Sequence, residues 1–433
     1  MSDLTIIFSI AIILYLLVMW RAGETYPVLY LFLFTYFLQY IFSTYLMYNV
    51  YREVGIRMAI RQEPYFEYAI PALLSLFAGV FVFNKDVSIR DRLKTVDPHQ
   101  AAQMGFILLG VSYSFDILSL VGYDSFNSIV SFTQYLKYVG AFCFLFTNSW
   151  FKYFLGILVY CQLAVIVLLG GVFIDFINWA TYLFFFVALK FRFPFALRAC
   201  FIIAALPVLT LIQSVKDEYR RATWTNKQEA SLGLFSELAQ KKNEKEIDEP
   251  FSQQEGVVST IGRLNEGWHL GMTLNHVPRK QPIANGEEMI GDLTSSLLPR
   301  VLFSGKKVVH TREKFYQYTG RKLGSGTSMT IGLLGDFYIN YGRTGSFIML
   351  FIFGGLIAKF VHYFIKRYVI PDPINIVWIP FMLSYLVRAD DDFYIIFNCL
   401  LKGFIIFLAV NYLRYKVFKA KKPVLVSPIR DSR

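Results

Sequence analysis

Residues 4–20 read LTIIFSIAIILYLLVMW, an apolar run that contains no charged side chain. A helix that crosses a bilayer needs about 20 mostly apolar residues, because its backbone groups must be hydrogen-bonded within the segment. This first run is long enough. It lacks the basic residues and the small-residue cleavage site of a secretory signal peptide, so we expect it to remain as a membrane span.

The same criterion, applied along the chain, predicts an all-α polytopic membrane protein with about eleven transmembrane helices. The expected spans cover residues 4–20, 26–48, 66–83, 104–121, 126–148, 154–169, 173–189, 195–212, 346–365, 374–386 and 393–412. They divide the chain into an N-terminal transmembrane bundle of about eight spans (1–213), a large helical loop (214–327), and a C-terminal part with a re-entrant segment and about three spans (328–433).

Composition supports this class of protein. Of the 433 residues, 55% are apolar and only 17% are charged, whereas a soluble domain carries about 25% charged residues. A water-soluble enzyme and a disordered chain are thereby excluded. The net charge of +12 is typical of basic cytoplasmic loops, and we predict no nucleic-acid partner. The four cysteines all lie inside apolar runs, which argues against a disulfide framework or a cysteine zinc site.

Lys and Arg next to the spans predict the orientation. They collect in 85–94, 190–198, 366–367 and the C-terminal tail, which we therefore place in the cytoplasm. Eleven spans then put the N-terminus and the loop 214–327 outside. The outer loop 51–65 departs from this pattern, since it carries Arg52, Arg57 and Arg61. Two interpretations stay open: contact with lipid headgroups or a span count that is off by one, and binding of an anionic ligand.

Two segments near the large loop are too polar for ordinary spans and too apolar for ordinary loops. Residues 286–307 read GEEMIGDLTSSLLPRVLFSGKK and residues 324–345 read GSGTSMTIGLLGDFYINYGRTG. Irregular backbone at membrane depth persists only where protein or a watery cavity covers it. We expect re-entrant half-helices around a pocket at the outer leaflet, with free N–H groups directed at an anion. Within the loop, 227–245 is expected to be a charged surface helix and 255–275 one amphipathic helix.

These segments carry a resemblance. Arg263, the stretch LLPRVLFSGKK with Pro299, Arg300 and Lys306, and the run SMTIGLLGDFYINYGRTG resemble the O-antigen and oligosaccharide repeat-unit polymerase (Wzy) family of bacterial envelopes. The resemblance implies a GT-C-like glycosyltransferase of the inner membrane that works at the periplasmic face. Its partners would be undecaprenyl-diphosphate-linked oligosaccharides, membrane lipids and a chain-length regulator protein, and its product O-antigen or capsular-type polysaccharide.

The departing diphosphate gains negative charge during transfer, and preorganised cations in a dry site stabilise that charge best. Arginine suits this role because its guanidinium binds phosphate oxygens in pairs and stays charged. The candidate diphosphate-binding residues on the outer side are Arg263, Arg300, Lys306, Arg343 and Arg388. Each also has a structural alternative: an interface anchor for Arg300, a solvated face for Arg263, and an ion pair or cap for Arg388 beside Asp390.

The acceptor hydroxyl must lose a proton, which a positioned base would accept. The candidate catalytic residues are Asp336, His269 and Glu266. On one ideal helix Arg263, Glu266 and His269 share about a third of the circumference. Asp336 lies in an otherwise apolar run, where a carboxylate serves either as base or as partner of a nearby arginine.

A metal ion is the alternative to arginines at the diphosphate. Asp390 to Asp392 form a D-x-D pattern that holds a metal in other glycosyltransferases, but aspartates directly before the span at 393 are expected to cap its N-terminus. We therefore predict no metal and no cofactor. Tyr338, Tyr341 and Trp268 are the aromatic residues that we expect near glycan.

Three other functions stay open. An O-antigen ligase differs only in its acceptor, which is the lipid A core. A non-enzymatic transporter or flippase predicts ionisable residues through both leaflets, whereas here they concentrate on one side. An exosortase-like transpeptidase needs an outer-surface nucleophilic cysteine, and Cys143 and Cys399 lie within expected spans.

Overall fold

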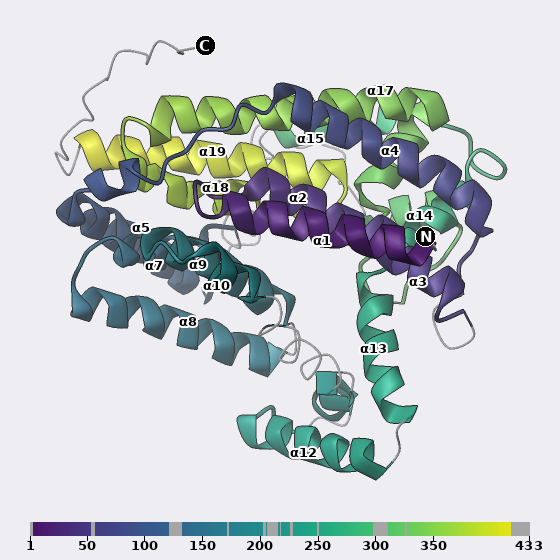
Figure 1. The fold of residues 1–433 in the computed structure, drawn as a ribbon, viewed down its shortest axis with the longest axis horizontal. Coiled ribbons are helices and arrows are strands. Elements are labelled where there is room, and N and C mark those ends of the chain that lie inside the picture. Colours follow the sequence, from purple (N-terminus) through teal and green to yellow (C-terminus); the bar gives the residue numbers. More distant parts are fainter. Residues whose placement is uncertain are drawn as a thin grey trace.

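The computed structural model describes residues 3–52, 57–120, 132–170, 173–201, 205, 215–216, 218–225, 228–248, 251–297, 311–324 and 327–416. These residues form helices and connecting segments, and none of them lies in a β-strand. Long helices run side by side along the longest axis of the molecule, whereas α12 (Leu232–Asp248) and α13 (Phe251–Leu264) lie away from this bundle (Figure 1). The expectation of an all-helical fold is confirmed for the described residues.

Seven helices in the described part are long and apolar enough to cross a membrane, so the protein is a polytopic membrane protein. Five of them are uninterrupted: α1 (Asp3–Arg21), α4 (Gln62–Phe83), α5 (Pro98–Leu120), α8 (Trp150–Gly170) and α19 (Phe393–Lys416). Two contain a π-helical turn. One joins α2 (Val28–Phe37), π-helical Leu38–Phe42 and α3 (Ser43–Asn49), and the other joins α17 (Gly332–Phe364) to π-helical Ile365–Val369.

At four other expected spans, the helices in the described residues have fewer than the 18 residues taken here as the minimum for crossing a membrane. Where we expected 126–148, α7 covers Leu136–Leu145, and where we expected 173–189, α9 covers Ile174–Lys190. Only α10 (Phe195–Ala199) falls in the run 195–212, most of which lies outside the described residues. The run 374–386 forms a 3-10 turn, Pro373–Val377, followed by α18 (Trp378–Leu383). The total of eleven stays a prediction.

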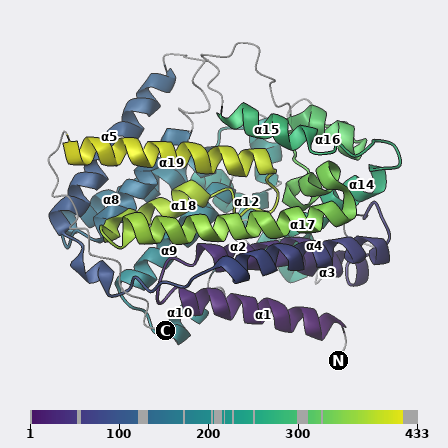
Figure 2. The same ribbon diagram turned by 90° about the horizontal axis from the view of Figure 1, so that it is seen from above.

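Helices α4 and α17 form the most intimate pair, and both views show them side by side (Figures 1 and 2). Glycines permit this approach: a Cβ at Gly79 would meet the carbonyl oxygen of Phe351, and one at Gly354 would meet that of Leu76. Close contact between backbones is how helices associate where no water drives their packing. The two helices are therefore closely packed along their length. The candidate functional residues lie at the end where α17 begins.

Helix α17 begins well before the expected span. We predicted a span at 346–365 preceded by a separate polar segment, but the helix starts at Gly332 and passes through that segment. The two parts meet at Gly342, whose φ of 66° and ψ of −168° are not helical. A side chain beyond hydrogen would be strained at this φ, so glycine allows the break. Residues 332–341 thus form a short helical piece in front of the main span.

The large loop differs from the prediction at one place. The charged helix expected at 227–245 is confirmed as α12. The single amphipathic helix expected at 255–275 is wrong, because the chain forms α13 and then a separate α14 (Gly267–His276), with Glu266 at its N-cap. A short polar connection, Asn265 and Glu266, interrupts the pattern, and the Asn265 side chain accepts a hydrogen bond from the Thr44 hydroxyl at 2.8 Å. Two further helices complete this region, α15 (Glu287–Leu297) and α16 (Thr311–Thr319).

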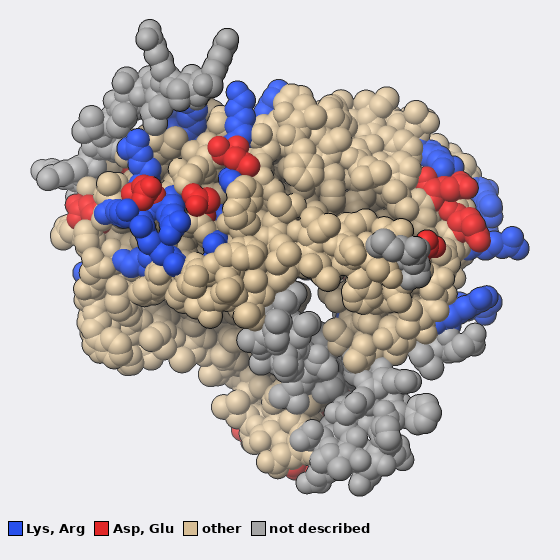
Figure 3. All heavy atoms as spheres, in the orientation of Figure 1, with Lys and Arg blue, Asp and Glu red and all other residues tan. Residues whose placement is uncertain are grey.

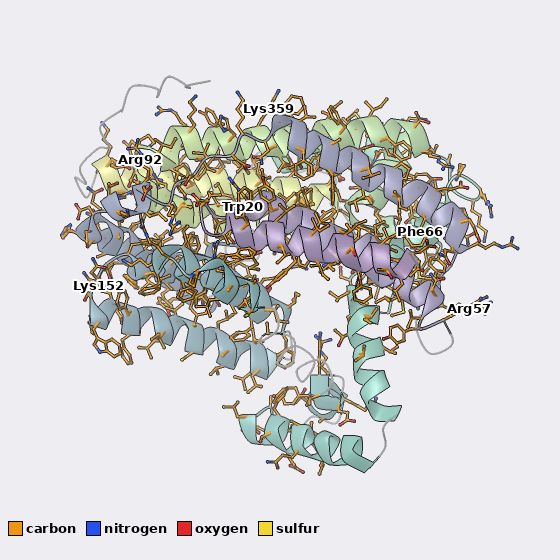
Figure 4. All side chains as sticks on the ribbon, viewed as in Figure 1. Trp20, Arg57, Phe66, Arg92, Lys152 and Lys359 are labelled. Atoms are coloured by element: carbon orange, nitrogen blue, oxygen red, sulfur yellow. The ribbon has the colours of Figure 1, made fainter. Side chains whose placement is uncertain are left out.

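Charged side chains gather toward the two ends of the long axis, on either side of a belt without charge (Figure 3). Arg92 and Lys152 lie at one end and Arg57 at the other (Figure 4). At the Arg92 end, Arg414 near the end of α19 is fully buried. Its guanidinium donates to Asp372 at 2.6 Å and to the side-chain oxygen of Gln100 at 2.7 Å.

Candidate functional site

The first residues of α17 and α19 meet at a buried group of charged side chains. Asp392, directly before α19, accepts hydrogen bonds from the backbone N–H groups of Ile331 and Gly332 at 3.1 and 3.0 Å. Asp336, in the first turns of α17, accepts one from the N–H of Phe393 at 3.0 Å. Each carboxylate thus satisfies the free N–H groups that begin the other helix, where negative charge is favoured.

Lys314 enters between these two aspartates from α16. Its ammonium lies 2.9 Å from Asp336, 3.2 Å from Asp292 and 3.7 Å from Asp392. The four side chains are almost fully buried, with exposed fractions of 6% for the lysine and 0 to 4% for the aspartates. We call Lys314, Asp292, Asp336 and Asp392 the Lys314 cluster. A buried ammonium is tolerated when several carboxylates surround it.

Helix periodicity explains how α15 and α16 supply their members. On α15 the buried residues Met289, Asp292 and Ser295 are spaced by three, so they lie on one face. On α16 the buried face consists of Lys314, Phe315, Tyr318 and Thr319. Each helix therefore turns one buried face toward the bundle, and each of these faces carries one charged residue.

The cluster contains more negative than positive charge, and this raises the pKa of its acids. Burial, followed by the neighbouring aspartates, raises the pKa of Asp392 to about 7 and that of Asp292 to about 6, against the lowering effect of Lys314. Burial alone would lower the pKa of Lys314, but Asp336, Asp392 and Asp292 raise it above its ordinary value. Asp292 and Asp392 are therefore harder to ionise than free carboxyl groups, and Lys314 is harder to deprotonate than a free lysine.

Glu266 and His269 form a second pair beside the cluster. The Glu266 carboxylate lies 2.6 Å from His269 Nδ1, and both side chains are about nine-tenths buried. The imidazole packs edge-on against Phe315, the neighbour of Lys314, with ring centroids 5.6 Å apart. Burial lowers the pKa of His269, but the carboxylate of Glu266 outweighs it, so the pKa is raised. His269 Nε2 is buried and has no hydrogen-bond partner among the described residues.

This arrangement resembles a histidine prepared to accept a proton. A carboxylate at Nδ1 fixes the tautomer and the orientation of the ring and stabilises the imidazolium, while Nε2 stays available to a reacting group. The expected proximity of Glu266 and His269 is confirmed. The expectation that Arg263 shares their helix face is wrong, because Arg263 belongs to α13 and the chain breaks before α14 begins.

Arg388 connects the acidic region to a pocket. Its guanidinium lies 3.1 Å from Asp391 and 3.3 Å from Asp390. Burial would lower the pKa of Arg388, but the carboxylates of Asp391 and Asp390 outweigh this effect, so the pKa is raised above its ordinary value. On its other side the guanidinium lies over the ring of Tyr385, 5.2 Å from the centroid.

The Arg388 pocket lies between α9, the residues before α7 and the segment after α18. It is partly open, so its empty space of about 350 Å³ includes open solvent. Its polar groups are Arg388, Asp175, Asn178 and Ser384, and the rest of its wall is largely aromatic. Among the rings, Trp179 stacks on Tyr135 at a centroid distance of 5.9 Å. Aromatic faces with a few carboxylate, amide and guanidinium groups suit a polyhydroxylated ligand. The aromatic residues of the pocket are Phe132, Tyr135, Trp179, Tyr182, Phe381 and Tyr385.

The other expected diphosphate ligands do not gather at this place. Arg300 and Lys306 lie outside the described residues. Arg343 is half exposed and contacts Glu67, with its guanidinium 2.9 Å from the Glu67 backbone oxygen and 3.4 Å from the carboxylate. Arg263 is exposed in the last turn of α13. Of the three cations that the structure describes, Arg388 is therefore the one at a partly buried polar site.

The three expected glycan-binding aromatics also have protein partners. Tyr338 donates to the carbonyl oxygen of Val277 at 3.2 Å, and the Tyr341 hydroxyl lies 3.5 Å from the Met289 sulfur. The guanidinium of Arg321 lies over the Trp268 ring at 4.6 Å. None of the three lines the Arg388 pocket, whose aromatic residues the sequence analysis did not select.

Two expectations about aspartates are corrected. Asp392 caps α17 rather than α19, because the two helix ends face each other and its side chain reaches across. The partner of Asp336 is Lys314 and not an arginine. Lys314 and Asp292 were missed, because no local pattern in the sequence distinguishes them from other charged residues. In the described residues no three His, Cys, Asp or Glu side chains are placed to hold a metal ion.

Comparison with known proteins identifies a family without assigning a function. The family model described as a domain of unknown function (DUF8712) matches residues 28–366, which is most of the chain, so the protein belongs to this family. The match includes Glu266, His269, Lys314 and Asp336. No curated protein and no solved structure matches the chain.

Proposed function

We propose that this protein is a membrane glycosyltransferase that polymerises undecaprenyl-diphosphate-linked oligosaccharide repeat units into O-antigen or capsular-type polysaccharide. In this proposal it lies in the bacterial inner membrane with eleven spans. The loop 214–327 and the N-terminus face the periplasm, and the C-terminus faces the cytoplasm. The short helical piece 332–341 and α15 act as the re-entrant segments at the outer leaflet.

The observation that carries the proposal is the pair of Glu266 and His269. A sugar hydroxyl is a weak nucleophile that needs a base when it attacks an anomeric carbon. His269 has the required features: Nδ1 is held by a carboxylate at 2.6 Å, while Nε2 is buried without a partner among the described residues. A protein that moves its substrate without coupling to protons has no need of a base. The pair therefore favours transfer chemistry over passive transport.

The proposed reaction forms one carbon–oxygen bond, breaks another, and moves one proton. The acceptor hydroxyl oxygen bonds to the anomeric carbon of the donor, and the bond from that carbon to the diphosphate oxygen breaks, which releases undecaprenyl diphosphate as an anion. The hydroxyl proton passes to His269 Nε2, and Glu266 stabilises the resulting imidazolium. The Arg388 pocket would hold sugar rings against its aromatic wall. Arg300, Lys306, Arg263 and Arg343 remain the proposed diphosphate ligands of the outer segments.

Reconstitution tests the reaction. The purified full chain is placed in liposomes with undecaprenyl-diphosphate-linked repeat units, and the products are separated on a gel. We expect a ladder of lengthened chains for the wild type and at least a hundredfold slower formation for His269→Gln, which is the contribution of a general base. The matched control is His276→Gln, at the end of the same helix α14, which should form the ladder normally. A normal ladder from His269→Gln removes His269 from the mechanism.

The related ligase reaction differs only in its acceptor. Lipid A core oligosaccharide is therefore offered in the same assay, in competition with a second repeat unit. Elongated lipid-linked chains support polymerisation, whereas transfer to the core alone assigns the protein as a ligase.

Transport is a second candidate because the Lys314 cluster has a specific feature in its favour. Buried acids with pKa values of about 6 and 7 exchange protons near neutral pH, which ion-coupled transporters require. This candidate predicts that a fluorescent lipid-linked repeat unit crosses the liposome membrane without elongation when a pH gradient is applied. Elongation without a gradient supports the transferase instead.

A further inference from the structure

A second polar pocket lies at the opposite end of α17 from the Lys314 cluster. It is formed where α1 ends, by the residues that lead into α2, by the segment after α4, and by the last turns of α17. It is partly open, so its empty space of about 340 Å³ includes open solvent. We call it the Arg21 pocket, after the residue at the end of α1. Asp336 begins α17 and His362 lies in its last turn, so the two sites are a full helix length apart.

The Arg21 pocket concentrates buried polar atoms without partners. Arg21 Nε, the hydroxyl oxygen of Thr25, and His362 Nδ1 have no hydrogen-bond partner among the described residues, and all three residues line this pocket. Arg21 and Thr25 are only 6% and 7% exposed. Buried polar groups are almost always satisfied, so several unsatisfied ones in one place indicate a ligand.

The unsatisfied groups are mainly donors. The carboxylate of Asp86 already accepts from the Tyr30 hydroxyl at 2.9 Å and from the Asn84 amide at 3.0 Å, and it lies 2.9 Å from Arg21 Nη2. Arg21 Nε can only donate, and the Thr25 hydroxyl can donate. Lys85 at the rim adds a positive charge. A ligand with several acceptor oxygens and negative charge fits this set better than a neutral one.

The position of the pocket agrees with such a ligand. The candidate spans α1 and α4 end at Arg21 and Phe83, so the pocket lies where these helices leave the apolar layer. Trp20, the neighbour of Arg21, lies at the end of α1 nearer to Arg92 (Figure 4), and Lys and Arg side chains gather at that end of the molecule (Figure 3). This is the depth at which phosphate groups of lipids lie.

We infer that the Arg21 pocket binds a phosphate group, with the Arg21 guanidinium and the Thr25 hydroxyl as donors. The phosphate comes either from a phospholipid headgroup or from free phosphate in solution. The inference does not depend on the proposed transferase reaction.

Native mass spectrometry of the full chain in detergent tests the inference with three probes. Dioleoyl phosphatidylglycerol carries the phosphate, dioleoylglycerol has the same chains without it, and inorganic phosphate lacks the chains. We expect the wild type to retain phosphatidylglycerol and not dioleoylglycerol. Arg21→Gln should weaken retention about tenfold and Thr25→Val about threefold, which correspond to a charged and a neutral hydrogen bond. Arg92→Gln, which removes the same charge at the same end outside the pocket, should retain the lipid as the wild type does.

Each outcome decides. Free phosphate is the ligand if millimolar inorganic phosphate displaces phosphatidylglycerol from the wild type and does not do so from Thr25→Val. Retention that resists inorganic phosphate identifies the headgroup. Equal retention of phosphatidylglycerol and dioleoylglycerol overturns the inference, as does undiminished retention by both Arg21→Gln and Thr25→Val. Thr25→Val keeps the shape of the side chain, so it reports on the pocket even if Arg21→Gln does not fold.

Discussion

Asp336 and Asp392 cap each other's helices. Asp336 caps the N-terminus of α19, and Asp392 caps the N-terminus of α17. Asp336, in α17, accepts from the first N–H of α19, and Asp392, directly before α19, accepts from the N–H groups at the start of α17. The two residues are far apart in the chain, so this exchange fixes the relative position of two membrane helices. Lys314 then neutralises part of the charge that the exchange brings together.

Replacing Lys314 by Met should destabilise the protein strongly. The lysine is 6% exposed and faces three carboxylates, and removal of one partner from a buried ionic group costs about 3 to 5 kcal/mol. The measurement is thermal unfolding of the detergent-solubilised protein, followed by tryptophan fluorescence. Lys322→Met, an exposed lysine in the segment after α16, is the control and should leave the midpoint unchanged. Equal midpoints for Lys314→Met and the wild type would show that the cluster adds no stability.

Stability should fall as the pH rises from about 4 to about 7. Folding raises the pKa of Asp392 to about 7 and that of Asp292 to about 6, both above the ordinary 3.8. The native state therefore holds more protons than the unfolded state across this window, and the stability it gains is lost as the pH passes through the folded values. Lys314 stays charged in this range and contributes a constant amount.

Asp392→Asn should flatten the upper part of that pH profile. Asparagine keeps an acceptor oxygen for the N–H groups of Ile331 and Gly332 but cannot ionise. The unfolding midpoint of this variant, measured at intervals of half a pH unit, should depend less on pH near 7 than that of the wild type. An unchanged slope would assign the pH dependence to other groups.

Alanine at Gly342 should destabilise the break in α17. The backbone there has a φ of 66° and a ψ of −168°, a combination that costs a residue with a side chain about 1 to 3 kcal/mol. A Cβ would also lie 3.0 Å from Ile283. Gly110→Ala in α5 is the control, because a Cβ there meets nothing within 4 Å. Alanine is the better helix former, so this control should unfold at the same or a higher temperature.

The pH profile of chain elongation tests the pair of Glu266 and His269. If neutral His269 is the base, elongation falls as the histidine becomes protonated. Glu266 raises the pKa of His269, so Glu266→Gln should lower that pKa and move the acid limb of the profile to lower pH. The rate of ladder formation at saturating substrate is the readout. Glu287→Gln, at an exposed position on α15, should keep the wild-type limb. An acid limb at the same pH in Glu266→Gln would exclude His269 as the titrating group.

The spans were predictable where apolar residues are continuous. Expected residues 4–20, 66–83 and 393–412 correspond to α1, α4 and α19 with ends displaced by a few residues. Hydropathy is reliable there because a lipid-exposed backbone must form its own hydrogen bonds. The start of α17 was not predictable in this way. Asp336 and Asn340 made its first turns look polar, but they are satisfied by Lys314, Phe393 and Met289, which come from other parts of the chain.

The candidate site was predictable only where its contacts are local. Glu266 and His269 are three residues apart, so helix geometry brings them together. Lys314 and Asp392 are distant in sequence, and no local pattern distinguishes Lys314 from the other charged residues of its short helix. The aromatic wall of the Arg388 pocket was missed for the same reason. Trp179 and Tyr385 are ordinary residues of apolar runs until the fold places them around one space.

Helix α19 is held at both termini. Asp336 accepts a hydrogen bond from its first N–H. At the far end, the buried guanidinium of Arg414 donates hydrogen bonds to Asp372 and Gln100. Such a helix can neither tilt nor slide without breaking charge-assisted hydrogen bonds, so its position in the bundle is fixed. Helix α1 is the opposite case, since only 17% of its apolar window is buried. Most of α1 therefore presents an apolar surface outward, whereas α19 keeps the charged residues at its two ends in place.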